Sequence, residues 1–594
     1  MKIFRHIAAL QPLFFLCLLL PVAPAVPGAD TPILPLSGIK PGMTGEWHTV
    51  VSGTRIDRFP FEVVGIAQNF IGPRRPVIIC RGLDATNRLT GPVAGMSGSP
   101  VYIDGKLIGA YAYGFLYPRD QDLFGVTPIE QMLEVEQYPE ATNAVFTAAE
   151  KSDAMPQWLA APATGAGLPA PSALQSLMKP LPTPLFVSGV SERTLQQFES
   201  RLKALGLQVM QAPSGSAAEV LDTNLEPGAA VSGVLMSGDF EFAGTGTVTW
   251  RDGNRLLAFG HPFMQQGPTA MPMAPAEVIT VVQSWVRSFK LINVGPVVGT
   301  IYQDRLTAIA GEIGKLPPTT HVEIHVQSPD GRERLFRGDM FQNRDYSPIL
   351  SAISLLESLY DTMESEYEQT IYLDTDLEIP GHAPVRLLDT ATGQEGGMEL
   401  AIQQLALYET LLNNPCEFPR VQSLTFHVRL VNGRNLSRLD SVAVDANAVH
   451  PGDTLNAVIG LRNYRRDATN LSVAIPVPAG VRAPELQLFV GDADAALQVD
   501  EPSWSPPQTL DQLLDRLRKT RSHQNICVKL LQEAPGLAVE GKNLPDLPPS
   551  VAAQFESPNS RQPVATLREI TLWETNLPVA GTFEGQMRLP VRIK

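Results

Sequence analysis

Gly95-Met96-Ser97-Gly98-Ser99-Pro100 leads directly into Val101-Tyr102-Ile103-Asp104-Gly105-Lys106-Leu107-Ile108-Gly109-Ala110. The second stretch has two apolar runs separated by Asp-Gly, which predicts a β-hairpin because a type I′ turn needs positive φ at both central positions. In the first stretch a serine stands between glycines, where a tight turn can expose its Oγ and nearby backbone N–H groups can stabilise an oxyanion. The pattern predicts either a nucleophile loop ahead of a hairpin or an ordinary Gly/Ser loop.

A serine nucleophile needs a base at neutral pH, and the base needs a group that orients it. Two histidines are candidates for the base. His48 would give the chain order His48, Asp84, Ser97 of trypsin-like enzymes, and His261 follows a predicted strand. Asp84, in a loop upstream of the serine, is the candidate carboxylate. Each has an ordinary alternative, since His48 could be a strand residue, His261 a turn residue and Asp84 a turn former.

The chain resembles the SpoIVB-type serine peptidases in residues 58–65, in the GMSGSP motif at 95–100 and in residues 104–110. The first serine of that motif is the nucleophile of the family. The resemblance therefore implies that Ser97 is the nucleophile here, with Ser99 as a supporting turn residue.

The same resemblance favours His261 over His48 as the base, because residues 244–261 resemble the strand that carries the histidine of the family. It also favours Asp84 as the acidic residue. In the family the histidine segment precedes the serine segment, whereas here it follows, as in a circular permutation. Chain order does not exclude catalysis, because convergent sites depend on final geometry alone.

These assignments predict an acyl-transfer reaction that needs no cofactor. Ser97 attacks a peptide carbonyl, His261 takes and returns the proton, Asp84 orients the imidazole, and N–H groups near Gly95 and Ser97 hold the oxyanion. An unperturbed histidine pKa of about 6.5 predicts that activity falls at low pH. The expected substrate is a peptide or protein outside the cytoplasm, including the chain itself, because residues 141–184 form an accessible Ala/Pro-rich linker.

A second class of function is compatible with the same sequence. The peptidase-like region could be a catalytically silent scaffold of a cell-envelope binding or assembly protein, with recognition carried by the C-terminal β domains, since fold does not imply function. Two alternating strands carry polar faces that could bind metal. One has His321, Glu323 and His325, and the other, which could bind calcium, has Asp374, Asp376 and Glu378. Solvated strand faces are the simpler interpretation of both.

Composition limits the partners. The 594 residues correspond to about four domains at roughly 150 residues each. With 46 Lys and Arg against 61 Asp and Glu, the net charge is −15, so a nucleic-acid partner is not expected. The 52 prolines and 47 glycines favour many turns and short strands over long helices.

The N-terminus has the pattern of a secretory signal peptide. Lys2 and Arg5 precede an apolar stretch that ends near Leu20, and small residues follow it. We predict that residues 1–29 are removed, the alternative being an uncleaved anchor. No later stretch reaches the roughly 20 apolar residues of a membrane span. The mature chain is therefore expected to be periplasmic or secreted.

Cleavage would leave Cys80, Cys416 and Cys527, whose wide spacing fits neither a zinc site nor a dense disulfide framework. At most one bridge could form. The pair Cys416 and Cys527 is favoured because Cys80 lies close in sequence to the GMSGSP motif. Free buried thiols are the alternative.

Strand-like alternation dominates the chain, with helices predicted at residues 195–205, 349–366 and 510–517. The predicted fold class is mainly β and multidomain: a trypsin-like two-barrel peptidase region, then a β-sandwich and a small α/β segment. The expected parts are a serine-bearing half (30–140), the linker (141–184), a helix with the histidine-bearing β half (185–335), a helical and strand connecting region (336–420), an Ig-like β-sandwich (421–500) and a C-terminal α/β segment (501–594).

Overall fold

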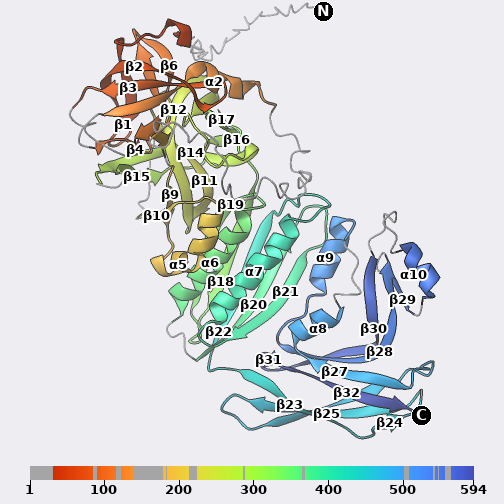
Figure 1. Ribbon diagram of the computed structural model, residues 1–594. Helices are drawn as coiled ribbons and strands as arrows, with labels where there is room; N and C mark the ends of the chain where they lie inside the picture. The colour runs from red at the N-terminus through yellow and green to blue at the C-terminus, as the bar shows by residue number, and fades with distance from the viewer. Residues whose placement is uncertain are drawn as a thin grey trace, which may run out of the picture.

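The computed structural model describes residues 31–84, 90–115, 122–139, 178–181, 183–212, 224–284, 288–363, 368–500, 507–539, 542–545, 547–555 and 564–594 (Figure 1). The predicted signal peptide lies outside the described residues, and so do residues 141–177 of the predicted linker. The described part is mainly β, as predicted.

The N-terminal part is a closed β-barrel. Its strands pair in the order β5, β1, β2, β3, β7, β6, and β6 pairs again with β5. Large apolar side chains, including Trp47, Tyr111 and Phe124, fill the interior. The predicted hairpin is confirmed, because Asp104 and Gly105 have φ values of 49° and 72° between β5 and β6. The strands are β1 (Thr44–Val50), β2 (Ile56–Gly72), β3 (Arg75–Gly82), β5 (Ser99–Ile103), β6 (Lys106–Phe115) and β7 (Leu123–Pro128).

A second group of strands also pairs in a closed circuit, in the order β12, β13, β17, β16, β14, β11 and back to β12. Apolar residues from these strands, such as Val248, Leu256 and Met271, are buried in one core. The predicted strands at 231–236, 246–250 and 256–259 correspond to β11, β12 and β13. The strands are β11 (Ala230–Gly238), β12 (Glu241–Asp252), β13 (Arg255–Ala258), β14 (Gly267–Val282), β16 (Gly299–Arg305) and β17 (Ala308–Ile313).

The barrel and the circuit pack directly against each other. Leu107 and Ala110 of β6 and Met132 of α2 (Ile129–Leu133) share an apolar cluster with Leu257 of β13 and Tyr302 of β16. A hairpin extends the contact: β15 (Ser288–Val294) pairs antiparallel with β14 and parallel with β4 (Val93–Ala94). Figure 1 shows β15 beside β4 at the edge of the N-terminal barrel.

A central sheet continues from the circuit through β19 and carries helices α6 and α7 on one face (Figure 1). The predicted helix at 195–205 is α5, whose N-cap Ser191 accepts a hydrogen bond from the N–H of Thr194.

None of the helices in the described part of the chain has the length and apolar composition needed to cross a membrane. β8 (Met178–Pro180) pairs with β6 at the side of the N-terminal barrel. The other elements are β9 (Leu185–Ser188), α5 (Glu192–Ala204), β10 (Val209–Gln211), β18 (Thr319–Gln327), β19 (Glu333–Phe341), α6 (Ser347–Thr362), β20 (Gln369–Glu378), β21 (Val385–Thr392), α7 (Gly396–Leu412) and β22 (Ser423–Asn432).

The C-terminal part contains two packed sheets, one of β26, β25, β23 and β31 and one of β24, β32, β27, β28, β29 and β30. Their facing side chains, such as Ile459, Leu488 and Val528, form one core. The sandwich therefore draws strands from both segments that the sequence analysis separated at residue 500. The elements are β23 (Leu436–Val444), β24 (Ala448–Val449), β25 (Thr454–Asn463), β26 (Thr469–Pro476), β27 (Glu485–Gly491), α8 (Ala493–Asp500), α9 (Leu510–Arg518), β28 (Asn525–Val539), β29 (Lys542–Pro545), α10 (Pro549–Phe555), β30 (Val564–Pro578), β31 (Thr582–Glu584) and β32 (Gln586–Ile593).

Two further expectations need correction. The start of the sandwich was predicted at residue 421, but β22 lies in the central sheet, where it pairs parallel with β18 and antiparallel with β20. The favoured bridge between Cys416 and Cys527 is wrong, because the cysteines of the described residues are all free. Cys80 and Cys527 are buried, each within its own apolar core. Both errors concern contacts distant in sequence, which local patterns do not report.

His523 links the central sheet to the C-terminal part. Its Nδ1 lies 2.8 Å from Asp389 Oδ1 of β21, and its Nε2 lies 3.5 Å from Asp494 Oδ2 of α8. Burial lowers the pKa of His523, but the hydrogen bonds to the two carboxylates outweigh burial and raise it to about 10. The histidine is therefore charged at neutral pH and holds the two parts together.

We expect His523→Gln to lower the melting temperature at about pH 6 and to lower it less at about pH 10. The folded-state pKa lies above the ordinary value of about 6.5, so the stabilisation is complete below that pH and is lost as the pH rises through about 10. Thermal unfolding of both proteins across this range gives the comparison. The exposed His450→Gln is the control, and a difference independent of pH would contradict the assignment.

Candidate active site

Ser97 lies in a tight loop between β4 and β5. The flanking Gly95 and Gly98 have φ values of 94° and 96°, a region that glycine enters at little cost. Ser99 closes the turn, because its hydroxyl donates to the Met96 carbonyl at 2.6 Å. The Ser97 side chain is fully buried, and its Oγ has no hydrogen-bond partner among the described residues. An unpartnered buried hydroxyl costs about 1–3 kcal/mol, so a functional explanation is warranted.

The N–H groups of the same loop divide into two sets. Those of Met96, Gly98 and Ser99 donate to the carbonyls of Val93, Tyr111 and Met96. Within the described ranges, those of Gly95 and Ser97 have no acceptor. Two unoccupied donors two residues apart, beside a serine hydroxyl, are what an oxyanion-binding site requires.

Strand β12 fixes this loop against the second circuit. The N–H of Thr247 donates to the Ser97 carbonyl at 2.8 Å, and its hydroxyl donates to the Gly95 carbonyl at 3.1 Å. The hydroxyl of Thr249 donates to the Gly98 carbonyl at 2.6 Å. Residues two apart on a strand share a face, so these alternating threonines point toward the loop. They are a sequence signal that the motif-based interpretation missed.

His261 follows β13 after a sharp turn in which Phe259 and Gly260 have φ values of 71° and 70°. The Phe259 N–H donates to the Thr247 carbonyl at 3.2 Å, so Thr247 binds both the serine loop and the histidine turn. The Gly260 carbonyl accepts the hydroxyl of Thr127 from the N-terminal barrel at 2.6 Å. The turn that carries His261 is thus held at the junction of barrel and circuit.

The His261 ring is held in one tautomer by the backbone. Its Nδ1 lies 2.7 Å from the Pro262 carbonyl, and because a carbonyl only accepts, Nδ1 carries the proton and Nε2 the lone pair. Nε2 is buried and has no partner among the residues that the structure describes. Burial lowers the pKa of His261 to about 4, although the Pro262 hydrogen bond opposes the shift. The ring is therefore neutral at pH 7, and the expectation of an unperturbed pKa needs correction.

No hydrogen bond joins Ser97 Oγ to His261 Nε2 in this conformation. Their segments nevertheless meet closely: a Cβ placed on Gly246 would lie 2.4 Å from the Phe259 ring and 3.0 Å from the Ser97 carbonyl oxygen. The Phe259 ring in turn lies 6.2 Å from the His261 ring. Catalytic hydrogen bonds are often long in unliganded enzymes and tighten when substrate binds.

The other two candidates lie elsewhere. Asp84 follows β3 and, after burial, is the largest influence that raises the pKa of Tyr111 in the N-terminal barrel. No hydrogen bond joins Asp84 to His261, whose Nδ1 is taken by Pro262. His48, on β1, has its Nε2 2.9 Å from Glu46 Oε1 and its ring 4.7 Å from that of Tyr102. Within the described residues the His261 ring is thus hydrogen-bonded to Pro262, and His48 is hydrogen-bonded to Glu46.

Asp304 is a buried carboxylate that the sequence did not single out. It accepts the backbone N–H groups of Phe263 at 2.8 Å and Met264 at 2.7 Å, in the loop directly after His261. Burial raises the pKa of Asp304, and the N–H bonds partly offset that shift. Asp304 therefore anchors the histidine loop from β16. Its partners lie about forty residues away in sequence, so no local pattern indicates them.

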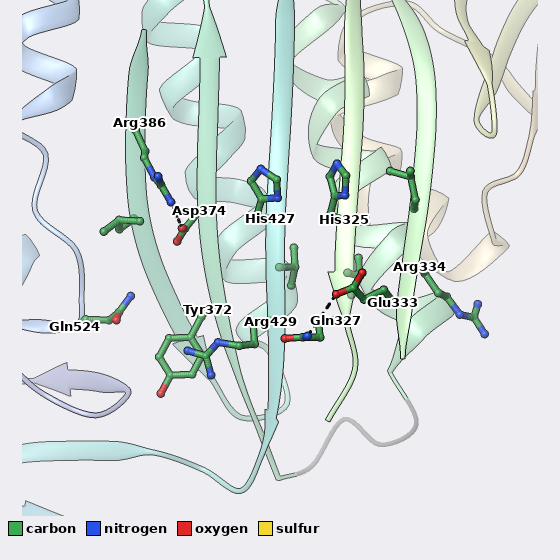
Figure 2. Close-up of a pocket in the computed structure, with 14 residues that line it drawn as sticks. His325, Gln327, Glu333, Arg334, Tyr372, Asp374, Arg386, His427, Arg429 and Gln524 are labelled. Atoms are coloured by element: carbon green, nitrogen blue, oxygen red, sulfur yellow. Dashed lines mark hydrogen bonds and ion pairs between the residues drawn. The ribbon is translucent and has the colours of Figure 1, made fainter. Parts of the chain in front are cut away.

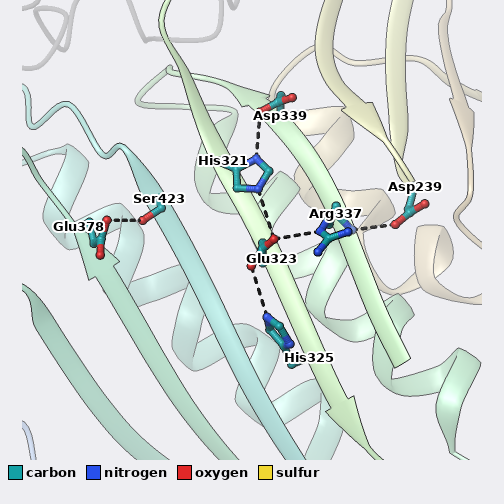
Figure 3. Close-up of polar contacts among 8 residues, drawn as sticks. All are labelled: Asp239, His321, Glu323, His325, Arg337, Asp339, Glu378 and Ser423. Carbon is teal, nitrogen blue, oxygen red and sulfur yellow. Dashed lines mark hydrogen bonds and ion pairs between the residues drawn. The ribbon is translucent and has the colours of Figure 1, made fainter. Parts of the chain in front are cut away.

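The strand faces considered for metal binding are occupied by ion pairs. Glu323 lies between His321 and His325 on β18 and pairs with both (Figure 3). Its Oε1 also accepts a hydrogen bond from Arg337 Nε of β19 at 2.9 Å. The Arg337 hydrogen bond lowers the pKa of Glu323. Among the described residues, no three His, Cys, Asp or Glu side chains are grouped as a metal site requires. The carboxylate is already satisfied by its neighbours.

A groove of about 580 Å³ lies over the same sheet, where β18, β22, β20 and β21 present their side chains (Figure 2). His325 and His427 stack there with ring centroids 4.8 Å apart, and the Arg429 guanidinium lies 4.0 Å from the Tyr372 ring centre. Arg386 pairs with Asp374 at 2.7 Å. The groove has the polar and aromatic character of a recognition surface.

We expect Gly98→Ala to lower the free energy of unfolding by about 3 kcal/mol or more. An added Cβ would lie 1.9 Å from the Thr247 carbonyl oxygen and 2.5 Å from the Phe259 nitrogen, forcing the barrel and the circuit apart. Gly105→Ala is the matched control, because Gly105 also has positive φ but has nothing within 4 Å of its Cβ position. It should cost only about 1 kcal/mol. Equal losses in denaturant unfolding would contradict the proposed close contact.

Comparison of the chain with protein-family models, with curated proteins and with solved structures yields no match. Two features of the chain bear on function: the geometry around Ser97 and His261, and the sequence resemblance of the GMSGSP segment. Both point to one location, the junction between the N-terminal barrel and the second circuit of strands.

Proposed function

We propose that the protein is a serine endopeptidase, similar to the SpoIVB-type peptidases, that acts on peptides or proteins outside the cytoplasm. One observation carries the proposal: Ser97 Oγ and His261 Nε2 are both buried without partners among the described residues, on segments that Thr247 joins. Acyl transfer needs a nucleophile, a base and donors that bind the oxyanion. The N–H groups of Gly95 and Ser97, which have no acceptor among the described residues, supply these donors.

In the proposed reaction, His261 Nε2 removes the proton from Ser97 Oγ, which attacks the substrate carbonyl carbon. The N–H groups of Gly95 and Ser97 hold the resulting oxyanion. The imidazolium then gives its proton to the leaving amine, and water, activated by the same nitrogen, hydrolyses the acyl-enzyme. The Pro262 carbonyl, in place of the expected Asp84, keeps the ring in the required tautomer. This chemistry needs no cofactor.

The architecture supports the proposal. A closed barrel and a closed circuit of strands pack together with the candidate residues at their junction, and a trypsin-like peptidase likewise has its catalytic residues between two packed barrels. Full burial of Ser97 means that this conformation is closed, and substrate must open the junction before attack. The N-terminal signal pattern supports export, and the Ala/Pro-rich composition of residues 141–184 is typical of segments that peptidases cleave, including by self-cleavage.

A small fluorophosphonate should label the intact protein at Ser97, since such probes trap activated serines. Ser97→Ala should abolish labelling, whereas Ser99→Ala should retain it at a reduced rate because only the turn hydrogen bond is lost. Mass spectrometry of the labelled peptide identifies the site. Failure of folded wild-type protein to react at any pH would refute the peptidase proposal.

The acid side of the labelling profile should reveal the base. Because burial lowers the pKa of His261 to about 4, the rate should hold down to about pH 5 and fall as the pH drops through about 4. His261→Ala should lose labelling, and His48→Ala, which removes a ring bound to Glu46, should keep it. A labelling rate that falls as the pH drops through about 6.5, or a loss of labelling in His48→Ala, would overturn the assignment of His261 as the base.

The groove in Figure 2 favours one alternative, a catalytically silent recognition protein. Its described lining offers stacked histidines and a guanidinium over a tyrosine ring, groups that bind polar or anionic ligands. An unreactive Ser97 in a folded protein that still binds peptides at this groove would support that class. Substitution of Arg429 would then weaken binding without affecting the folded state.

A further inference from the structure

Lys290 lies beside the nucleophile loop, in a position that no motif indicated. Ser288 and Phe289 of β15 pair with Val93 and Ala94 of β4, so Lys290 follows in register with Gly95. A Cβ placed on Gly95 would lie 3.3 Å from the Lys290 Cβ and Cδ atoms. The aliphatic part of the lysine therefore runs along the glycine that begins the GMSGSP motif.

The amine of Lys290 reaches two threonine hydroxyls. Its Nζ lies 2.8 Å from Thr49 Oγ1 of β1 and 3.4 Å from Thr247 Oγ1 of β12. The Thr247 hydroxyl donates onward to the Gly95 carbonyl at 3.1 Å. A continuous hydrogen-bonded chain thus runs from the lysine amine to the backbone of the nucleophile loop.

Lys290 is fully buried and pairs with no carboxylate among the described residues. Burying an unpaired cation is costly, and a hydrophobic side chain would fill this space at lower cost. The groups that face Nζ from β1 and β12 are hydroxyls, and the loop presents backbone at Gly95. Burial alone lowers the pKa of Lys290, to about 7, with no contribution from a charged neighbour.

We propose that Lys290 is a positioning residue for the acyl transfer: through Thr247 it fixes the Gly95 carbonyl and so directs the N–H groups of Gly95 and Ser97 at the oxyanion. The proposal depends on the proposed peptidase function. The Gly95–Met96 peptide lies between the two N–H groups, so its orientation affects both. Glycine at position 95 leaves that peptide free to rotate unless it is held.

The charge on Lys290 decides how firmly the peptide is held. An ammonium group has three donors and no acceptor, so Thr247 Oγ1 must accept from it and give its single hydrogen to the Gly95 carbonyl. A neutral amine has a lone pair that competes for that hydrogen. Since the pKa of Lys290 is about 7, the oxyanion site should be best ordered below this pH.

The test is the second-order rate of fluorophosphonate labelling of Ser97 from about pH 4 to pH 9. Wild-type protein should show a decline centred near pH 7 on the basic side. Lys290→Met should react about tenfold or more slowly at pH 6, and its rate should no longer decline near pH 7. Thr247→Val should behave like Lys290→Met, because it removes the hydroxyl that connects the amine to Gly95. The exposed Lys106→Met is the matched control and should keep the wild-type profile.

Thermal unfolding checks that each variant is folded. Should Lys290→Met not fold, Lys290→Ala with added propylamine replaces it. Labelling restored by the amine, with a decline near pH 7 because the bound amine is buried as the lysine is, supports the proposal, and wild-type labelling of Lys290→Ala without the amine overturns it. A folded Lys290→Met with the wild-type rate and pH profile overturns the positioning role but leaves the peptidase proposal intact. Unreactive wild-type protein overturns both, so the two failures are distinguishable.

Discussion

Thr247, a single backbone position on β12, joins the two halves of the candidate site. Its N–H binds the Ser97 carbonyl, its carbonyl binds the Phe259 N–H, and Gly98 approaches so closely that no side chain could be accommodated there. This contact requires two separately closed groups of strands to pack against each other. The burial of the serine and the histidine, and the direction of the loop N–H groups, all depend on it.

Burial of polar groups sets the chemistry of this junction. Ser97, His261 and Lys290 are each almost completely removed from water, at a cost in stability that the apolar cores on both sides offset. The same removal lowers the pKa values of the histidine and the lysine, because a dry environment disfavours their charged forms. Burial is therefore the common cause of the neutral imidazole of His261 and of the titration of Lys290 near neutral pH.

The arrangement is compatible with the reversed chain order of the proposed peptidase site. The serine loop and the histidine turn contact each other through backbone hydrogen bonds between strands distant in sequence, and these bonds do not depend on which segment is made first. A backbone carbonyl, that of Pro262, holds the imidazole where a carboxylate was expected. The buried Asp304 does not bind the His261 ring but accepts backbone N–H groups of the loop that follows His261.

Local patterns in the sequence determined the β-hairpin after the motif, the helix capped by Ser191, most of the strands and the tight turn of the GMSGSP loop. Each follows from positive φ at a turn, from hydroxyl capping or from alternation, which neighbouring residues decide. Only the tertiary structure decided that Thr247 joins Ser97 to the His261 turn, that the Pro262 carbonyl holds the imidazole and that β22 belongs to the central sheet. It also revealed Lys290 and Asp304. These features arise from contacts between segments far apart in the chain, where packing and burial, rather than local preference, select the partner.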